Sequence, residues 1–328
     1  MKRIIAASAA VIIFAAFLPF ISAWVPSGAA EEPEPTAKAD FLPQRDEKVS
    51  VKLLDGGKTA ELTMRDYLIG VVAAEMPVKF QPEALKAQAV AARTYAMRSM
   101  LAGTKHAAEG ADVCSDPACC QAWLSGDELK KNWGGDYEAD IKKITDAVVS
   151  TDGQYLISGG EPILAAFHSS SGGYTDSSAE VWGAEEPYLV SVSSPESDKN
   201  VPNFVTTMTA GRLDFRDTLL SAHPEADFTG KPETWIGDAD RDGSGRVRTV
   251  KLGGVAVTGE ELRSLFGLRS TNFTLSYGYG AFTFTVTGSG HGVGMSQYGA
   301  QTMALAGSGY ADILTHYYPG AVLTGLQN

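Results

Sequence analysis

The chain has 328 residues, which is long enough to bury one large hydrophobic core or two smaller ones. Its formal net charge of −12 at pH 7 argues against a nucleic-acid-binding protein, because such a protein needs a basic face. Charged residues make up 20% and hydrophobic residues 44% of the chain, so the composition is that of a globular protein rather than a disordered one.

The first 24 residues indicate an N-terminal membrane anchor. Lys2 and Arg3 precede an apolar run that is long enough to span a bilayer, and Trp24 suits the membrane interface. We expect this segment to be retained, with a cleaved export signal as the alternative. Residues 25–48 are rich in Pro, Ala, Glu and Lys and predict a disordered linker. Residues 49–328 are therefore expected to form an extracytoplasmic domain.

A hairpin and two helices are predicted at the start of this domain. Residues 49–63 alternate as two strands around a Gly-Gly turn, and Thr63 is the expected N-cap of the first helix. The apolar stripe of that helix continues to Glu75, and Pro77 ends the helix. A glutamate that faces a core has a raised pKa, which suits a general acid. A partly exposed glutamate, or one neutralised by Arg93, is the alternative.

The second helix begins at Pro82 and has small residues along its contact face, which predicts close helix packing. Arg93 lies beside this face. Its guanidinium could bind a carboxylate or an anionic substrate group, or it could form a structural ion pair.

All three cysteines lie in one segment that also contains a histidine. An odd number of cysteines cannot pair completely within an exported chain. His106, Cys114 and Cys120 could bind Zn²⁺, with an aspartate or water as the fourth ligand. A disulfide between Cys114 and Cys120 that leaves Cys119 free is the alternative.

Polar residues that suit saccharide binding follow in two places. Gln121 lies beside Trp123, and an amide next to an aromatic ring suits sugar binding. A buried structural role is the more frequent one for a tryptophan. After a helix at residues 136–149 and two paired strands, a Ser/Gly-rich loop carries His168, Ser169 and Ser171. A serine-hydrolase site is disfavoured because Ser171 lacks the G-x-S-x-G pattern. The loop could bind a saccharide through hydrogen bonds. Alternatively, it is a turn in which the serine side chains bond to their own backbone.

The C-terminal part of the chain divides into two regions. Residues 201–267 suggest a second lobe, and its Asp-rich stretch imitates a calcium loop from Asp238. Thr249 occupies the twelfth position in place of glutamate, so we predict a hairpin turn instead. The last block combines a Gly-rich loop around His291 with a helix that starts near Ser296. The sequence contains neither a phosphate-binding loop nor an HExxH motif.

Four blocks resemble the stage II sporulation protein D family of membrane-anchored lytic transglycosylases, in the family's order and across residues 49–321. They are YLIGVVAAEMP with EALKAQAVAARTYA, the His…Cys…CQ-aromatic segment, FHSSSGGYT with EVWG and PYL, and GHGVGMSQYGA with ILTHYYPG. The resemblance implies a mixed α+β fold with two lobes around a substrate groove. It also implies cleavage of the MurNAc–GlcNAc bond of peptidoglycan during sporulation engulfment.

The resemblance further implies roles for individual residues. Glu75 would protonate the glycosidic oxygen and then accept a proton from the muramoyl C6 hydroxyl, which closes a 1,6-anhydro ring. Substrate contacts would come from Arg93, Gln121, His168, Ser169, Ser171, Lys199, His291, Gln297 and Tyr298. Some family members bind zinc through the cysteine segment. His106, Cys114 and Cys120 match that pattern, whereas Cys119 stands where another residue, often histidine, is expected.

The family prefers glycan that has lost its stem peptides, which implies cooperation with an amidase. The expected partners are the stage II sporulation amidase/endopeptidase P and the membrane protein M. A noncatalytic wall-binding enhancer of an N-acetylmuramoyl-L-alanine amidase is the alternative function. A metallohydrolase is disfavoured, because thiolate-rich zinc sites are usually structural.

Overall fold

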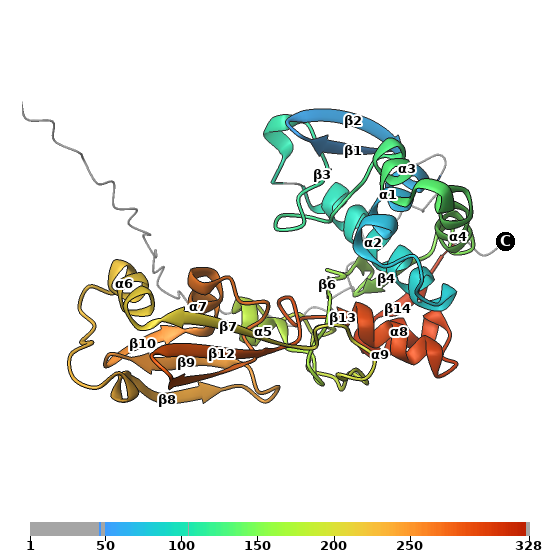
Figure 1. Ribbon diagram of the computed structural model, residues 1–328. Helices are drawn as coiled ribbons and strands as arrows, with labels where there is room; N and C mark the ends of the chain where they lie inside the picture. The colour runs from blue at the N-terminus through green and yellow to red at the C-terminus, as the bar shows by residue number, and fades with distance from the viewer. Residues whose placement is uncertain (1–45, 47–49, 104, 326–328) are drawn as a thin grey trace, which may run out of the picture. The chain divides into compact units, whose positions relative to one another are not determined.

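The computed structural model describes residues 46, 50–103 and 105–325 (Figure 1). Its elements are a mixture of helices and several small sheets, so the predicted α+β class is confirmed. The expected anchor at residues 1–24, and all of the linker at 25–48 except Asp46, lie outside the described residues. Within the described part of the chain, no helix is both long enough and apolar enough to cross a membrane.

The first elements follow the predicted order. Strands β1 (Ser50–Asp55) and β2 (Lys58–Thr63) form the antiparallel hairpin, and β3 (Val113–Cys114) pairs parallel to β1. The hydroxyl of Thr63 accepts a hydrogen bond from the amide of Asp66 at 3.1 Å, so it caps α1 (Met64–Glu75) as predicted. Helix α2 (Pro82–Ala102) follows the break at Pro77.

The first hydrophobic core is built around α2. The buried residues of this helix include Ala84, Leu85, Ala87, Ala89, Val90, Ala91, Ala92 and Ala96. Because these side chains are small, α1, α4 (Tyr137–Val149), α8 (Gln297–Leu305) and α9 (Tyr310–Tyr317) all pack against α2. Figure 1 shows α1, α2 and α4 side by side. The predicted close packing is confirmed.

Short elements complete this first core. They are η2 (Ala107–Glu109), α3 (Gly126–Trp133), η3 (Gly134–Asp136), β4 (Tyr155–Ser158), β5 (Glu161–Pro162), β6 (Phe167–His168), α5 (Ser178–Trp182), β13 (Met295–Ser296) and β14 (Val322–Thr324). Strand β4 pairs with both β5 and β14, and β13 pairs parallel to β6. The C-terminal block therefore pairs with strands from the middle of the chain.

A second hydrophobic core lies between Ala210 and Val286, so it continues past the predicted lobe at 201–267. Its elements are β7 (Val205–Gly211), α6 (Arg212–Ala222), η4 (Pro232–Trp235), β8 (Ile236–Arg241), β9 (Val247–Leu252), β10 (Val255–Thr258), α7 (Gly259–Phe266), β11 (Phe273–Gly278) and β12 (Ala281–Thr287). They form two three-stranded antiparallel sheets and two helices. The Asp-rich stretch is the predicted turn, in which Asp242 accepts hydrogen bonds from Ser244 and Arg246.

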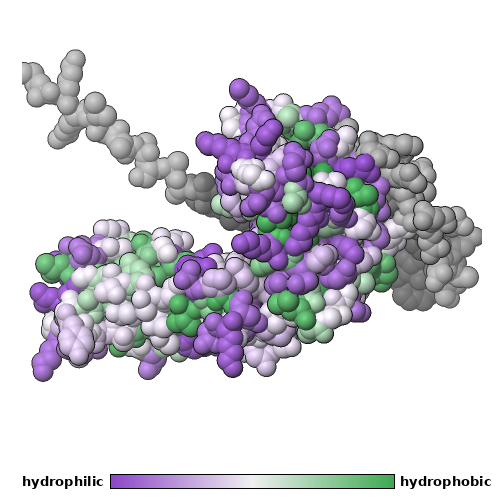
Figure 2. Space-filling model, turned by 45° about the vertical axis from the view of Figure 1, so that its right-hand side comes forward, coloured by the Kyte–Doolittle hydropathy of each residue, from purple (hydrophilic) through white to green (hydrophobic). Residues whose placement is uncertain are grey.

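The surface is largely hydrophilic on the face that Figure 2 shows. Hydrophobic residues on this face form small separate patches rather than one broad area. Such scattered patches are ordinary for a soluble domain, so this face gives no indication of a large apolar interface.

Candidate active site

A pocket of about 370 Å³ lies at the C-terminal end of α1. Its lining residues are Ala73, Ala74, Glu75, Met76, Pro77, Val78, Phe80, Trp133, Ser169, Gln297 and Tyr298. The pocket therefore combines residues from the helix break, from α3, from the Ser/Gly-rich loop and from the start of α8. Among these described lining residues, Glu75 carries the one carboxyl group.

The carboxyl of Glu75 is partly buried and held by two donors. Oε1 accepts a hydrogen bond from the backbone amide of Ala122 at 2.7 Å, and Oε2 accepts one from Nε2 of Gln297 at 3.3 Å. Burial raises the pKa of Glu75, and the two hydrogen bonds offset only part of that increase. Among the described residues no cation forms an ion pair with Glu75. A protonated carboxyl suits a general acid.

Gly70 allows the Ala122 amide to reach Glu75. A Cβ at Gly70 would lie 2.2 Å from Nε1 of Trp123 and 2.7 Å from the carbonyl oxygen of Leu124, so no larger residue fits there. The carbonyl of Gly70 accepts a hydrogen bond from the amide of Leu124 at 3.3 Å. The segment after the cysteines therefore lies directly against α1, one and a half turns before Glu75.

The pairing of β6 with β13 brings the other side of the pocket together. Ser296 caps α8 by accepting a hydrogen bond from the amide of Gly299 at 3.1 Å, and Gln297 is the first residue of that helix. The carbonyl of Ser169 accepts a hydrogen bond from the amide of Tyr298 at 3.1 Å. Ser169, Gln297 and Tyr298 therefore line the pocket with Glu75, as expected for substrate-contact residues.

Two other residues that were predicted to contact substrate, Arg93 and Gln121, form hydrogen bonds inside the first core instead. Arg93 is buried, and its guanidinium forms an ion pair with Asp46 and donates to the carbonyl of Gln154 at 2.9 Å. This is the structural alternative weighed for Arg93. Gln121 is also buried and donates to the hydroxyl of Tyr67 at 3.0 Å. Neither side chain lines the pocket.

His168 and Ser171 form a buried pair. Nε2 of His168 lies 2.8 Å from Oγ of Ser171, and Nδ1 lies 3.2 Å from the carbonyl oxygen of Val293. The carbonyl can only accept, so Nδ1 carries the proton and Nε2 accepts from the serine hydroxyl. Burial lowers the pKa of His168 well below its usual range, so the ring is neutral. His168 is 4% and Ser171 1% exposed, so the pair orders the loop and does not face the pocket.

Lys199 and His291 also lie outside the pocket lining. Lys199 is exposed, in the turn that follows Pro195. His291 is half-buried, its Nδ1 accepts from the amide of Val293 at 3.1 Å, and burial lowers its pKa to about 4. Its ring lies 5.4 Å from that of the exposed Trp182.

The sequence analysis missed three contributors to the site. Phe80 packs the edge of its ring against Tyr298 at 5.1 Å, and Trp133 lines the pocket from the end of α3. Their aromatic character was visible in the sequence, but nothing in the sequence indicated that the rings of Phe80 and Trp133 face the same pocket as Glu75. The backbone amide of Ala122 could not have been found, because its role depends on position and not on residue type.

The cysteine segment forms a compact group of four ligands. The donor atoms of His106, Cys114, Cys119 and Cys120 all lie within 4.8 Å of one another. Nε2 of His106 is 3.3 Å from Sγ of Cys119 and 3.6 Å from Sγ of Cys120. All three cysteines are free thiols, so the Cys114–Cys120 disulfide is not formed. One imidazole and three thiols suit tetrahedral zinc, and Cys119 supplies the fourth donor.

Comparisons with known proteins identify the family of the chain. A family model described as Stage II sporulation protein matches residues 56–157. The chain is 39% identical over 287 residues to Stage II sporulation protein D of Bacillus amyloliquefaciens, which covers 88% of this chain and 80% of that protein. It is 38% identical over 263 residues to Stage II sporulation protein D of Bacillus subtilis (strain 168), with 80% and 75% covered.

A more distant relative carries a different name. The chain is 30% identical over 315 residues to a protein called Amidase enhancer from Bacillus subtilis (strain 168), and the match covers 78% of this chain and 40% of that protein. Both the higher identity and the larger covered share of the relatives favour the sporulation proteins over the amidase enhancer. The chain belongs to the stage II sporulation protein D family.

Proposed function

We propose that the chain is a lytic transglycosylase that cleaves the MurNAc–GlcNAc bond of peptidoglycan glycan strands during sporulation engulfment. The observation that carries the proposal is the raised pKa of Glu75 in a pocket whose described lining holds no second carboxyl. Most hydrolysing glycosidases need two carboxylates, one on each side of the bond. A single acid suffices when the substrate supplies its own nucleophile.

The proposed reaction uses Glu75 twice. Its protonated carboxyl donates a proton to the glycosidic oxygen as the bond from that oxygen to the muramoyl C1 breaks. The C6 hydroxyl of the same muramoyl residue then attacks C1 and gives its proton to the Glu75 carboxylate. The products are a 1,6-anhydro-muramoyl end and a free hydroxyl on the other fragment. The N–H donors of Ala122 and Gln297 stabilise the carboxylate between the two proton transfers.

The rest of the pocket suits the rings of a sugar chain. Phe80, Trp133 and Tyr298 offer aromatic surface for the apolar faces of sugar rings, and the side chains of Ser169 and Gln297 offer hydrogen bonds. No lysine or arginine lines the described pocket, so the described lining would hold a strand through contacts with its sugar rings rather than through ion pairs. The family resemblance supports glycan from which an amidase has removed the peptides as the substrate.

We also propose that His106, Cys114, Cys119 and Cys120 hold a structural zinc ion. The ion would cross-link the segment that ends at Gln121, one residue before the amide that binds Glu75. The protein would supply all four ligands of a tetrahedral zinc ion, so no coordination position would remain for substrate. The ion would therefore stabilise the site without taking part in the reaction.

The remaining expectations concern the setting of the reaction. We propose that residues 1–24 anchor the chain in the cell membrane with the catalytic domain outside the cytoplasm. Under this proposal, the stage II sporulation amidase/endopeptidase P supplies the stripped glycan, and the membrane protein M is the membrane partner. Co-purification from detergent extracts of sporulating cells tests both partners.

Mass spectrometry of the products tests the proposed reaction. Amidase-stripped glycan strands are incubated with the purified full-length chain and, separately, with its Glu75→Gln variant. We expect 1,6-anhydro-muramoyl ends from the wild type, and a rate that is lower by about 10²- to 10⁴-fold in the variant. Reducing ends would identify a hydrolase and refute the proposed mechanism.

The relative named Amidase enhancer supports a second candidate function, in which the chain binds glycan and stimulates an amidase without cleaving the strand. The same incubation separates the two. Intact strands that sediment with the protein, together with a faster amidase reaction, would favour the enhancer. In that case Glu75→Gln would leave the stimulation unchanged.

A further inference from the structure

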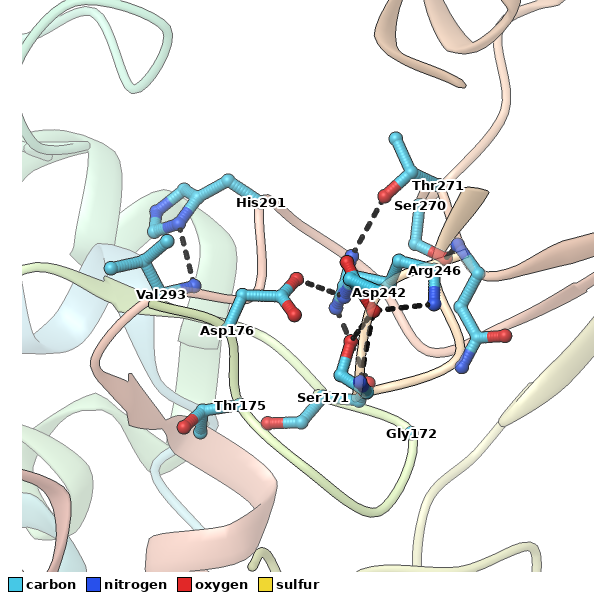
Figure 3. A network of polar contacts seen from close by, with 12 residues as sticks. Ser171, Gly172, Thr175, Asp176, Asp242, Arg246, Ser270, Thr271, His291 and Val293 are labelled. Atoms are coloured by element: carbon cyan, nitrogen blue, oxygen red, sulfur yellow. Dashed lines mark hydrogen bonds and ion pairs between the residues drawn. The ribbon is translucent and has the colours of Figure 1, made fainter. Parts of the chain in front are cut away.

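Arg246, from the second lobe of the sequence, is a buried cation that connects several distant segments. Its side chain is 2% exposed. Nε lies 2.6 Å from Oδ2 of Asp176, Nη1 donates to Oγ1 of Thr271 and to the carbonyl of Gly290 at 3.3 Å each, and Nη2 donates to the carbonyl of Ser171 at 3.2 Å. Figure 3 shows the guanidinium between Asp176 and Thr271.

The backbone is shaped to admit this guanidinium. A Cβ at Gly292 would lie 2.6 Å from Cζ of Arg246, and Gly292 has φ +88°, a conformation that favours glycine. The carbonyl of Gly292 accepts a hydrogen bond from the amide of Asp176 at 2.8 Å. The glycine therefore permits both the close approach of the arginine and the contact with its carboxylate partner.

The two segments that Arg246 joins both end at the pocket. The serine loop (residues 169–176) begins with Ser169, and the glycine loop (residues 288–296) leads directly into Gln297, which binds Glu75. Ser170 and Ser289 exchange two backbone hydrogen bonds at 2.9 and 2.8 Å between these loops. Arg246 contacts a backbone carbonyl in each loop.

A buried anion joins the same two loops from another direction. Oε1 of Glu196 accepts hydrogen bonds from the amides of Ser171 and Gly172, the second at 3.2 Å. Its Oε2 accepts from Oγ of Ser296 at 2.7 Å. Carbonyls of both loops therefore contact the guanidinium of Arg246. N–H groups of the serine loop and an O–H group of the glycine loop donate to the carboxylate of Glu196. Such an arrangement specifies one relative position of the two backbones.

We propose that Arg246 is a positioning residue of the candidate active site, which fixes the serine loop against the glycine loop so that Ser169 and Gln297 keep their places beside Glu75. This inference rests on the proposed function. A buried ion pair is weak evidence for stability, because desolvation opposes the attraction between its charges. The contacts to carbonyls in both loops are what give the arginine a geometric role. A displacement of about 1 Å in a site can cost about 100-fold in rate.

The test compares two arginines that lie two residues apart. Arg246→Met removes the buried contacts and keeps most of the side-chain volume, whereas Arg248→Met removes an exposed ion pair with Glu180 on α5. With stripped glycan strands, we expect Arg246→Met to lower kcat by about 10- to 100-fold with little change in KM. Arg248→Met is expected to keep wild-type kinetics. Arg246→Lys keeps a charge beside Asp176 and should recover part of the rate.

A pH profile separates positioning from simple destabilisation. The hydrogen bond from Gln297 lowers the pKa of Glu75, so its loss moves the upper limb of the kcat profile to higher pH. We expect this upward shift in Arg246→Met and not in Leu219→Ala, which removes a buried side chain of the second core on α6. A shift absent from Arg246→Met, or equal in both variants, would overturn the proposal.

Hydrogen exchange tests the role of Arg246 even if the chain cleaves no glycan. The proposed function then fails, but the loops can still be examined. We expect Arg246→Met to speed amide exchange in residues 169–176 and 288–296 and to leave α2 protected. If exchange in both loops matches the wild type, Arg246 does not hold them and the inference is wrong, whatever the reaction.

Discussion

The two hydrophobic cores differ in the types of residue that form them. The first core contains a helix of small residues, α2, against which four other helices pack, and it also encloses polar groups such as Gln121 and His168. The second core is dominated by aromatic rings, and Phe215 stacks on Phe282 with centroids 3.8 Å apart. The first core thus accommodates buried, hydrogen-bonded polar groups among small side chains. The aromatic side chains of the second core each contribute more to stability than alanine side chains do, because large rings bury more apolar area.

Both regions use a buried arginine–aspartate pair at their margins. Arg93 pairs with Asp46, which precedes the first strand, and Arg246 pairs with Asp176 in the serine loop. Burial raises the pKa of Asp176 to about 6, although Arg246 lowers it. Arg93 lies within α2, whereas Arg246 directly precedes β9. The difference is that only the second pair lies on loops that reach the pocket.

The largest expected effect is that of metal removal on the first core. A chelator under reducing conditions should lower the unfolding temperature of the native protein, since structural zinc contributes on the order of 10 kcal/mol to the folding of small zinc domains. Differential scanning calorimetry with metal analysis measures this change. Cys119→Ser should bind zinc more weakly than the wild type. A native protein that contains no metal and is indifferent to chelator would contradict the four-ligand site.

Asp46→Ala should destabilise the first core by about 3–5 kcal/mol, because it leaves the Arg93 guanidinium buried without its carboxylate. Urea unfolding measures the free energy. Glu186→Ala is the matched control, because it removes a half-exposed partner from Arg98 and should cost less than about 1 kcal/mol. Equal losses in the two variants would show that Asp46 is not part of the folded domain.

Phe215→Ala should cost the second core about 3–5 kcal/mol through the cavity that it leaves. Tyr279→Ala, at a fully exposed turn, should change stability little. Calorimetry then shows whether the two cores unfold together. A separate early transition in Phe215→Ala, with the first core unaffected, would show that Arg246 and its contacts do not couple them.

Gly70→Ala should cost less stability than the two preceding core substitutions, up to about 2 kcal/mol net, because an overpacking cost of about 1–3 kcal/mol is partly offset by helix propensity, and it should have a clear effect on pH dependence. Alanine favours the helix by about 1 kcal/mol, but its Cβ would displace Trp123 and with it the Ala122 amide. In the proposed reaction the acid form of Glu75 is the active one, so cleavage is expected to fall as pH rises through a pKa that lies above the usual value for glutamate. Loss of the amide donor raises that pKa further. A pH–rate profile that is identical to the wild type would contradict the role given to Ala122.

The sequence determined what depends on neighbouring residues. The Gly-Gly hairpin, the Thr63 cap, the helix end before Pro77 and the Asp242 turn follow from local conformational preferences, and the structure has all of them. The apolar stripe that ends at Glu75 also pointed to a raised pKa, with a partly exposed glutamate as the alternative, and the structure has a partly buried Glu75 whose pKa is raised.

Only the tertiary structure decided which residues meet. The Glu75 carboxyl binds an amide 47 residues and a glutamine 222 residues further along the chain, and Arg93 finds Asp46 in a segment whose composition suggested a linker. Cys119 joins the ligand group because a turn folds it back toward His106. Local patterns are set by short-range sterics and periodicity. Contacts across the fold are set by how whole elements pack, and a single sequence carries no direct signal of that packing.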